Sequence, residues 1–354
     1  MSAAARRAPP SAISAPLALT MGDPAGIAPD ITLAAWHALR GSDEVFALVG
    51  DADVLRQRAE RLGSPTPITV ISELIEATSV FGNALPVLSI PCPAVVVAGK
   101  PDPRNAAVII ASIERAVAAV KEGAARAMVT NPIAKSVLMA EGFPHPGHTE
   151  FLGALAETHF GMRNVRPVML LASEMLKVVP LTVHIPLVEV PKAVTSRSII
   201  ETARILHRSL IDDFGIHEPR IAVTGLNPHA GEDGKMGDED ARVIAIAIGA
   251  LRDEGLTVTG PHPADTLFHA AARETYDAVL AMYHDQALIP IKTLAFDSGV
   301  NVTIGLPFVR TSPDHGTAFS IAGTGEARAT SLIEALKLAD RMAQRRAFVQ
   351  SETV

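Results

Sequence analysis

The feature that most constrains the fold is a regular alternation of short apolar runs with longer amphipathic segments. Runs rich in β-branched and aliphatic residues predict strands at 16–21, 45–50, 94–99, 126–131, 167–173, 176–184, 220–226, 277–284 and 300–305. Helical periodicity predicts helices over Pro29–Arg40, Asp53–Leu62, Asn105–Lys121, Ser196–Phe214, Asp240–Glu254 and Glu326–Arg345. Most of the strands lack alternating polarity, which is typical of strands covered on both faces. The sequence therefore predicts an α/β fold with a largely parallel sheet.

The length of 354 residues predicts about two domains. A Gly-, Pro- and His-rich stretch at 142–150 and the segment Thr311–Pro313 are the expected crossings between them. We accordingly expect one domain to comprise residues 1–141 and 313–354, and the other to comprise residues 142–312. Residues 1–15 are small and Pro-rich, which predicts a disordered tail.

The composition excludes several classes of protein. The chain has 31 Lys and Arg against 38 Asp and Glu and no long basic run, so no nucleic-acid partner is expected. The single cysteine, Cys92, excludes a disulfide framework and a Cys-rich zinc ribbon. No apolar run approaches the roughly 20 residues of a membrane span, and the first residues lack the apolar core of a signal peptide. We expect a cytoplasmic enzyme without a membrane partner.

Neither of the common nucleotide-binding fingerprints is present. The segment GDPAGIAPD at 22–30 fits neither GxGxxG nor GxxxxGK[ST]. The segment GTGEA at 323–327 follows a predicted helix and not a strand. Any nucleotide must therefore be held by another architecture.

Three histidines follow apolar strands at or just beyond their carboxyl ends. His184 ends LKVVPLTVH, His229 follows RIAVTGLNP, and His284 ends DAVLAMYH. In open α/β sheets this edge faces the ligand, and three neutral imidazoles suit Zn²⁺, Co²⁺ or a similar divalent cation. The alternative is that each histidine is an ordinary hydrogen-bonded loop residue.

Two further groups predict the binding of an anion. Lys292, Asn301 and Arg310 recur at a spacing of nine residues in mostly apolar surroundings, which favours a phosphate or carboxylate clamp over solvated surface charge. His148 and Thr149, in GHTEFLG, directly precede a predicted helix, where an anion site and a simple cap are both sensible.

The motifs taken together identify the chain as a member of a known family. GDPAGIAPD, TNPIAK, GHTEF, TVHIPL, GLNPHAGE, GPHPADTLF, YHDQALIPIK and GVNVTIGLPFVRTSPDHGTA resemble the 4-hydroxythreonine-4-phosphate dehydrogenase family of pyridoxal 5′-phosphate biosynthesis. The resemblance runs from about Leu17 to the last helix, with the motifs in family order. One departure is Asn131 in TNPIAK, where many members carry glycine.

The resemblance implies an isocitrate/isopropylmalate dehydrogenase-like fold, with two α/β domains flanking an active-site cleft. Residues 1–141 and 313–354 would form the nucleotide side, and residues 142–312 the metal, substrate and dimerisation side. The family is a homodimer whose active site draws on both subunits. The resemblance implies that the metal ligands are His184, His229 and His284. The implied substrate contacts are His148, Thr149, Lys292, Asn301 and Arg310. The implied cofactor contacts are Asp314, His315, Gly316 and Thr317.

The reaction that the resemblance implies is the NAD-dependent oxidation of 4-(phosphooxy)-L-threonine at C3, with decarboxylation to 3-amino-2-oxopropyl phosphate. NAD is favoured over NADP because no basic cluster for a 2′-phosphate is visible, and the divalent metal (Zn, Co or Mg) is left open. Asp265 or Asp285 is expected to accept the hydroxyl proton or to tune the metal ligands, and the sequence does not choose between them. A paralogue acting on 4-phospho-D-erythronate or D-threonate, a metal-dependent aldolase or decarboxylase, and a non-catalytic solute-binding protein remain alternatives.

Overall fold

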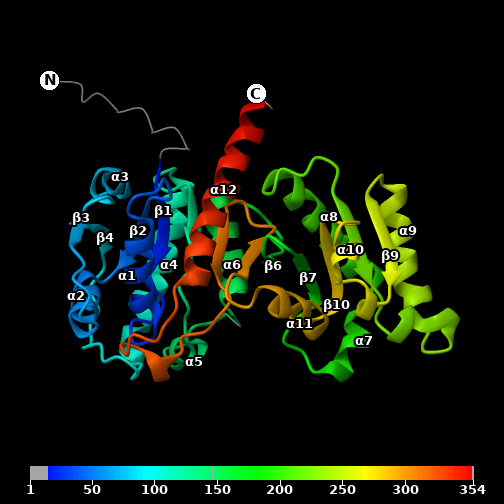
Figure 1. Cartoon of the computed structure of the whole chain (residues 1–354), viewed down its shortest axis with the longest axis horizontal. Helices are drawn as coiled ribbons and strands as arrows, with labels where there is room; N and C mark the ends of the chain where they lie inside the picture. Colours follow the sequence, from blue (N-terminus) through cyan, green and yellow to red (C-terminus); the bar gives the residue numbers. More distant parts are fainter. Residues whose placement is uncertain (1–14, 146, 353–354) are drawn as a thin grey trace. The chain divides into compact units, whose positions relative to one another are not determined.

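The computed structural model describes residues 15–145 and 147–352, and they form two compact units (Figure 1). Unit 1 contains the chain up to Val165 and again from Pro307 onwards. Unit 2 is the inserted segment Arg166–Leu306. The predicted tail at 1–15 lies outside the described residues except for Ala15, which is buried. No helix among the described residues is long and apolar enough to cross a membrane.

Unit 1 contains a parallel sheet whose strand order is β3-β4-β2-β1-β5-β12. The strands are β1 (Leu17–Thr20), β2 (Phe46–Gly50), β3 (Ile68–Ile71), β4 (Leu85–Ser89), β5 (Ala127–Val129) and β12 (Arg310–Pro313). Every residue of β1, β2, β5 and β12 is buried, as the lack of alternating polarity predicts. The carboxyl ends of these four neighbours therefore lie along one edge.

Helices cover both faces of this sheet. α4 (Ala106–Lys121) packs on β1, β2 and β5, and α6 (His148–Phe160) packs on α4. α2 (Ala52–Arg61) packs on β3 and β4, and α12 (Thr330–Glu352) packs on β5 and β12; α1 (Ala28–Leu39) contacts both of these helices. The short helices α3 (Ala77–Val80) and α5 (Lys135–Ala140) complete the unit.

Unit 2 contains a mixed sheet in the order β11-β6-β7-β10-β8-β9. The strands are β6 (Val168–Ala172), β7 (Lys177–Thr182), β8 (Arg220–Thr224), β9 (Thr257–His262), β10 (Ala278–Tyr283) and β11 (Val300–Ile304). β6 runs antiparallel to both β7 and β11, while β7, β10, β8 and β9 are parallel. Three of these parallel strands, β7, β8 and β10, precede the predicted histidines.

The helices of unit 2 also lie on the sheet faces. α8 (Ser196–Asp212) packs on β7, β11 and α9 (Ala245–Asp253), while α11 (His284–Ala295) packs on β6, β7 and β10. α7 (Val190–Ala193) and α10 (Ala270–Arg273) are short. Beneath α11 the core gathers apolar side chains from strands and helix, among them Leu171, Val178, Val279, Ala287 and Ile291.

The predicted α/β class is confirmed, and all six predicted helices are present. With the π-helical turn before α9 included, five agree within two residues, whereas α12 begins four and ends seven residues later than predicted. The predicted strand at 94–99 is wrong, since the segment contains no strand and forms only a single bridge between Val97 and Lys100. Val95 and Val97 are 82% and 44% exposed, so the apolar run does not enter the core. The sheet instead takes up β3 and β4, whose strand character the sequence analysis did not detect.

The limits of the units differ from the predicted domain limits of 141/142 and 312/313. α6 stays in unit 1 because it packs on α4, and the ring of Phe160 lies 5.4 Å from that of Phe308. β12 belongs to unit 1 because it pairs with β5. The assignment of a nucleotide role to one domain and of a metal role to the other stays a prediction.

Candidate functional site

Two of the predicted metal ligands follow neighbouring parallel strands of unit 2. In the register of β7 with β10, Thr182 lies opposite Tyr283, so His184 and His284 come within two residues of the same strand edge. Thr182 Oγ1 donates to the Met282 carbonyl at 2.9 Å and fixes the two strand ends to each other. His184 adopts a φ of 53°, a left-handed conformation that is uncommon for a residue with a side chain. The chain thus turns sharply at His184, just beyond the end of β7.

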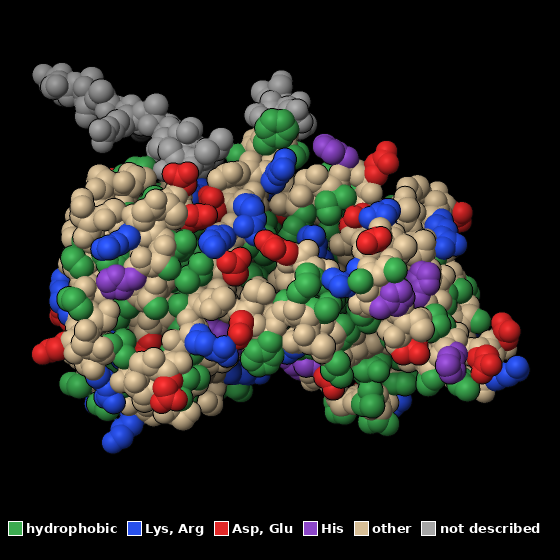
Figure 2. Space-filling model, viewed as in Figure 1, with side chains coloured by type: hydrophobic (Ala, Val, Ile, Leu, Met, Phe, Trp, Pro, Cys, Tyr) green, Lys and Arg blue, Asp and Glu red, His purple; other side chains and the backbone are tan. Residues whose placement is uncertain are grey.

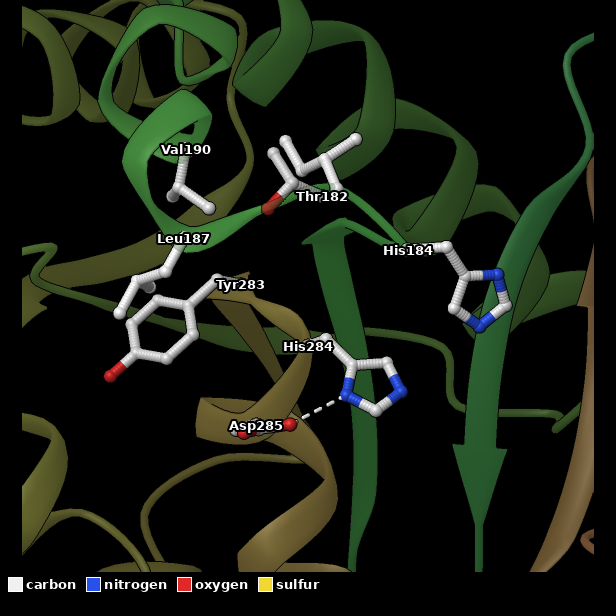
Figure 3. Close-up of a pocket in the computed structure, with 8 residues that line it drawn as sticks. Thr182, His184, Leu187, Val190, Tyr283, His284 and Asp285 are labelled. Carbon is white, nitrogen blue, oxygen red and sulfur yellow. Dashed lines mark hydrogen bonds and ion pairs between the residues drawn. The ribbon is translucent and has the colours of Figure 1, made fainter.

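The two imidazoles lie close enough to share a ligand. Their ring centroids are 5.7 Å apart, and both rings lie on one side of the pocket, away from Tyr283 (Figure 3). The His284 Nδ1 lies 2.7 Å from Asp285 Oδ1. A neutral imidazole that donates from Nδ1 to this carboxylate has its lone pair on Nε2. A carboxylate bonded to the other ring nitrogen is the usual orienting partner of a metal-binding histidine.

A cavity of about 270 Å³ lies beside this pair of histidines. Its wall combines polar groups from the ends of β7 and β10 with apolar residues of the segment before α7 (Figure 3). The lining residues are Thr182, His184, Ile185, Leu187, Val190, Tyr283, His284 and Asp285. A small polar molecule therefore has room beside the two imidazoles.

His229 lies in an unusual turn after β8. Five successive residues from His229 to Asp233 have φ values between 41° and 82°, and only one of the five is a glycine. Runs of left-handed residues are costly for residues with a Cβ, so the surroundings must hold this turn. His229 is exposed and does not line the cavity of the other two histidines. Among the described residues of this single chain, no group of three His, Cys, Asp or Glu is arranged to hold a metal ion.

The turn is held by a buried carboxylate, Asp240. Its oxygens accept hydrogen bonds from the backbone of Leu226 (2.7 Å) and Asn227 (3.2 Å) and from the Asn227 side chain (2.9 Å). Gly225 leaves room for this carboxylate, because a Cβ there would lie 2.6 Å from Asp240 Oδ1. The segment after β8 is therefore an ordered element with a strained backbone.

Gln286 connects the end of β8, which precedes the His229 turn, to the end of β10, which precedes His284. Its Oε1 accepts from the Thr224 hydroxyl (2.6 Å) and from the Met282 backbone (2.8 Å), while its Nε2 donates to the Gly225 carbonyl (2.8 Å). One amide thus fixes the ends of β8 and β10 to each other.

The two candidate proton acceptors meet in a second cavity of unit 2. A space of about 410 Å³ is lined by Asp265, Asp285, Tyr283, Gln286 and several apolar residues of α11. Asp265 lies in the one-turn helix Ala264–Thr266, which contacts the segment Pro228–Gly234 that carries His229. The structure therefore brings both carboxylates to the neighbourhood of the histidines and does not choose between them.

In unit 1, the structure brings together two of the predicted substrate ligands. The Arg310 side chain is 5% exposed and donates to Thr130 Oγ1 from Nε (3.1 Å) and Nη2 (2.6 Å). Burial lowers the pKa of Arg310 to about 10, which still leaves it charged at neutral pH. Burial and the charge of Arg310 hold the pKa of His148 well below its ordinary value of 6.5. His148 is therefore neutral, and Thr149 follows it in the first turn of α6.

A polar atom without a partner marks this place. His148 Nε2 is buried and has no hydrogen-bond partner among the described residues. A buried polar atom that lacks a partner is unfavourable, and the N-terminus of a helix attracts anions. The start of α6 beside Arg310 therefore has the properties of an anion site.

The remaining predicted ligands are placed as follows. Lys292 is a half-buried residue of α11 and Asn301 a half-buried residue of β11, both in unit 2. Asp314, His315, Gly316 and Thr317 form the loop after β12 in unit 1. The Asp314 backbone N–H donates to Ser331 Oγ at 3.0 Å, and the Thr317 carbonyl accepts from the Ile27 backbone at 3.0 Å. The loop is thus fixed on both sides.

Four residues that the structure places near these sites were not predicted from the sequence. Thr130 is the partner of Arg310, Asp240 and Gln286 hold the strand ends of unit 2, and Asp23 is a buried acid directly after β1. Asp23 could have been predicted, because an acid shortly after a mostly apolar strand lies at the ligand edge of the sheet. Asn131, which departs from the family pattern, donates to the Thr20 carbonyl (3.0 Å) and to Thr32 Oγ1 (2.9 Å) and so links β1 to α1.

Comparison with solved structures defines the class of protein. The fold matches a 4-hydroxythreonine-4-phosphate dehydrogenase from Klebsiella pneumoniae with a TM-score of 0.82 and 38% identity, over 93% of this chain and 98% of the other. A second enzyme of the same name, from Burkholderia phymatum, gives a TM-score of 0.79 and 36% identity over 93% and 98% of the two chains. The chain therefore has the architecture of an α/β dehydrogenase.

Sequence comparison identifies the family. The family model described as pyridoxal phosphate biosynthetic protein PdxA matches residues 43–339, and the chain belongs to this family. A 4-hydroxythreonine-4-phosphate dehydrogenase from Methylorubrum populi is 58% identical over 93% of this chain and 95% of its own length. The resemblance predicted from the motifs is confirmed.

Proposed function

We propose that the chain oxidises 4-(phosphooxy)-L-threonine with a nicotinamide cofactor in pyridoxal phosphate biosynthesis. Family membership and 58% identity to a dehydrogenase of that name support this function. In the proposed reaction a hydride passes from C3 to NAD⁺ and the hydroxyl proton passes to a base. The resulting β-keto acid loses CO₂ and gives 3-amino-2-oxopropyl phosphate.

The observation that best supports a phosphorylated substrate is the partnerless His148 Nε2 beside the buried Arg310 guanidinium. Arg310 presents a planar set of N–H donors that suits phosphate. A neutral His148 can supply one more donor without adding a second buried charge. We assign the phosphate and carboxylate contacts to His148, Thr149, Lys292, Asn301 and Arg310, as the resemblance implies.

The side chains around the His184–His284 pair fit a divalent cation. His184 and His284 offer two imidazoles with centroids 5.7 Å apart, and Asp285 orients one of them. These residues suit a cation such as zinc, and we assign His229 as the third ligand. When bound, the cation would lower the pKa of the substrate hydroxyl and stabilise the charge that develops during decarboxylation. Asp265 or Asp285 would then accept the proton.

We propose a homodimer in which the three histidines of one metal site come from two chains. His184 and His284 form a pair within one chain, and His229 lies outside their cavity. The segment before α7 exposes apolar side chains, with Leu187 and Val188 69% and 75% exposed, and hydrophobic side chains gather around α7 in Figure 2. Such a surface beside a site that lacks a ligand is typical of a subunit interface.

We assign the cofactor to the loop Asp314–Thr317 and favour NAD over NADP, as expected from the sequence. This loop follows β12 at the carboxyl edge of the unit 1 sheet, where open α/β sheets bind their ligands. His315 Nε2 in this loop is buried without a hydrogen-bond partner among the described residues. A cytoplasmic location remains a prediction.

The substrate panel is the test of this function. We expect NADH to form with 4-(phosphooxy)-L-threonine, with a higher kcat/KM than with 4-phospho-D-erythronate or 4-phospho-D-threonate. Activity should disappear on chelation and return when Zn²⁺, Co²⁺ or Mg²⁺ is added. A higher kcat/KM for either phosphorylated sugar acid would assign the chain to the paralogous reaction. Turnover of the substrate without NADH would favour a metal-dependent aldolase or decarboxylase.

A further inference from the structure

The turn after β1 holds a buried acid with half of its carboxylate unbonded. Asp23 is 2% exposed. Its Oδ1 accepts a hydrogen bond from the Ala25 backbone at 3.0 Å, whereas Oδ2 is buried and has no partner among the described residues. Burying a carboxylate oxygen without a donor is unfavourable. The position is therefore consistent with a site where a ligand supplies the missing donor.

The backbone around Asp23 is held firmly in place. The buried guanidinium of Arg58, which pairs with the buried Asp30, donates to the carbonyls of Gly26 (2.9 Å) and Pro24 (3.2 Å). The Asp23 backbone N–H donates to the Pro132 carbonyl at 2.8 Å, next to the end of β5. These contacts fix the backbone of the turn, and the bond from the Ala25 N–H holds the carboxylate on it.

The same turn lies directly against the loop that we assign to the cofactor. Ile27 N–H donates to the Thr317 carbonyl at 3.0 Å. A Cβ at position 26 would lie 2.7 Å from that carbonyl, so Gly26 is needed for this close approach. The turn and the loop carry two partnerless buried polar atoms, Asp23 Oδ2 and His315 Nε2. Both segments follow strands of one parallel sheet at its carboxyl edge.

The chemistry of a carboxylate oxygen limits what can bind there. An ionised Asp23 only accepts hydrogen bonds, so the ligand must present a hydroxyl, an amide N–H or an ammonium group. We propose that Asp23 is a cofactor-binding residue whose Oδ2 accepts a hydrogen bond from a ribose hydroxyl of the nicotinamide nucleotide. This inference rests on the proposed function. Contact with the Asp314–Thr317 loop favours the cofactor over the substrate, whose hydroxyl and ammonium groups are the competing donors.

A second acid of the same edge provides a matched control. Asp51 follows β2 and is also buried. Its Oδ1 accepts from the backbone of Asp53 (2.8 Å) and Val54 (3.3 Å), and its Oδ2 accepts from the backbone of Cys92 (2.7 Å). Both oxygens of Asp51 thus accept hydrogen bonds from the backbone of this chain, and Asp51 is the N-cap of α2. Asp51 should therefore matter for stability and not for the cofactor.

The experiment compares Asp23→Asn with Asp51→Asn. Asparagine at position 23 keeps the acceptor for Ala25 and places an amide donor where Oδ2 was. The dissociation constant for NAD⁺ is measured by calorimetry without substrate, and KM is measured for both substrates. We expect Asp23→Asn to weaken NAD⁺ binding about 10- to 100-fold while KM for 4-(phosphooxy)-L-threonine stays near the wild-type value. Asp51→Asn should leave NAD⁺ binding unchanged and lower the thermal midpoint.

Two outcomes would overturn the inference: unchanged NAD⁺ binding in Asp23→Asn, or a loss confined to KM for the phosphorylated substrate. If Asp23→Asn does not fold, Asp23→Ala, which removes the acceptor without adding a donor, is measured in the same way. These outcomes can be distinguished from a failure of the proposed function. If the proposed function were wrong, the wild-type protein itself would reduce no NAD⁺ with 4-(phosphooxy)-L-threonine.

Discussion

At the scale of single residues, buried charge and partnerless atoms indicate where ligands bind. Arg310 is buried among the strands of unit 1, and its guanidinium donates to Thr130 Oγ1. The pKa of His148 is lowered both by burial and by this guanidinium. A fold that needed only stability would gain little from this pair, since a buried charge is costly. We propose that an anion binds both groups and offsets the cost of burying them.

Replacement of Arg310 by alanine should therefore weaken substrate binding selectively. We expect KM for 4-(phosphooxy)-L-threonine to rise about 10- to 100-fold, because a hydrogen bond to a charged group contributes about 1.5–3 kcal/mol. KM for NAD⁺ should change little. Arg104, which is 75% exposed and pairs with Asp102, is the control residue, and Arg104→Ala should behave like the wild type. Equal increases in both KM values for Arg310→Ala would contradict the assignment.

Asp23 should make stability depend on pH in a direction that is unusual for an acid. Burial raises its pKa from 3.8 to about 6, against a smaller opposing effect of the Ala25 hydrogen bond. Because the folded state binds the Asp23 proton more tightly than the unfolded state, the free energy of unfolding falls as the pH rises from about 4 to about 6. Asp51 and Cys92 are the neighbouring titratable groups, and Asp23 helps to raise the pKa of Cys92.

Asp23→Asn removes the free-energy cost of ionising a buried carboxylate. The variant should therefore be more stable than the wild type above about pH 6, by on the order of 2–3 kcal/mol. Below about pH 4 the variant and the wild type should have similar free energies of unfolding, because Asp23 is then protonated in both states. Urea unfolding at several pH values measures the difference. A variant that is less stable than the wild type at neutral pH would show that Asp23 is a structural residue.

At the scale of elements, parallel strands explain which site residues could be predicted. Side chains that follow neighbouring parallel strands must meet at one edge, and this rule predicted His184 and His284, which the structure places side by side. The same rule also grouped His229 with them, but His229 does not line their cavity, because it lies in a left-handed turn, from His229 to Asp233, that has no simple sequence signature. The strand predicted at 94–99 failed because apolar composition does not reveal that Val95 faces solvent.

Gln286 was missed for a related reason, since its role depends on contacts with residues distant in sequence. Its amide joins Thr224 and Gly225 of one strand end to Met282 of another. Hydrogen bonds of this kind are formed only once β8 and β10 are paired in the sheet. Local sequence carries no signal for them.

Gln286→Glu should loosen this connection while leaving the helix intact. Glutamate keeps the oxygen that accepts from Thr224 and Met282 but loses the N–H that donates to Gly225. We expect the free energy of unfolding to fall by about 1–3 kcal/mol, and zinc affinity to fall with it because the His229 turn is less well held. Gln57→Glu, on the exposed face of α2, controls for the added charge. Unchanged zinc affinity would separate Gln286 from the metal site.

At the scale of the whole molecule, the account requires two chains for each metal site. Complementation tests this directly. His229→Ala and His284→Ala should each fold and each lose turnover and zinc binding. Mixing the two after mild dissociation should restore about a quarter of the wild-type activity, because half of the random dimers are mixed and one of their two sites is intact. No recovery in a mixture shown to contain mixed dimers would place all three ligands in one chain.

The exposed apolar segment before α7 should hold the subunits together. Replacing both Leu187 and Val188 by aspartate is expected to yield a folded monomer that binds zinc weakly, as measured by light scattering and metal titration. Val95→Asp in unit 1 provides the control, since Val95 is 82% exposed and lies outside the proposed interface. A double variant that remains dimeric would move the interface elsewhere on the protein.

The most direct test of the central claim is the stoichiometry of the reaction products. The metal-loaded enzyme is incubated with 4-(phosphooxy)-L-threonine and NAD⁺, and NADH and CO₂ are measured in the same sample. Oxidation at C3 followed by loss of the carboxylate predicts equal molar amounts of the two products. CO₂ released without NADH would contradict the proposed dehydrogenase chemistry, as would the formation of neither product.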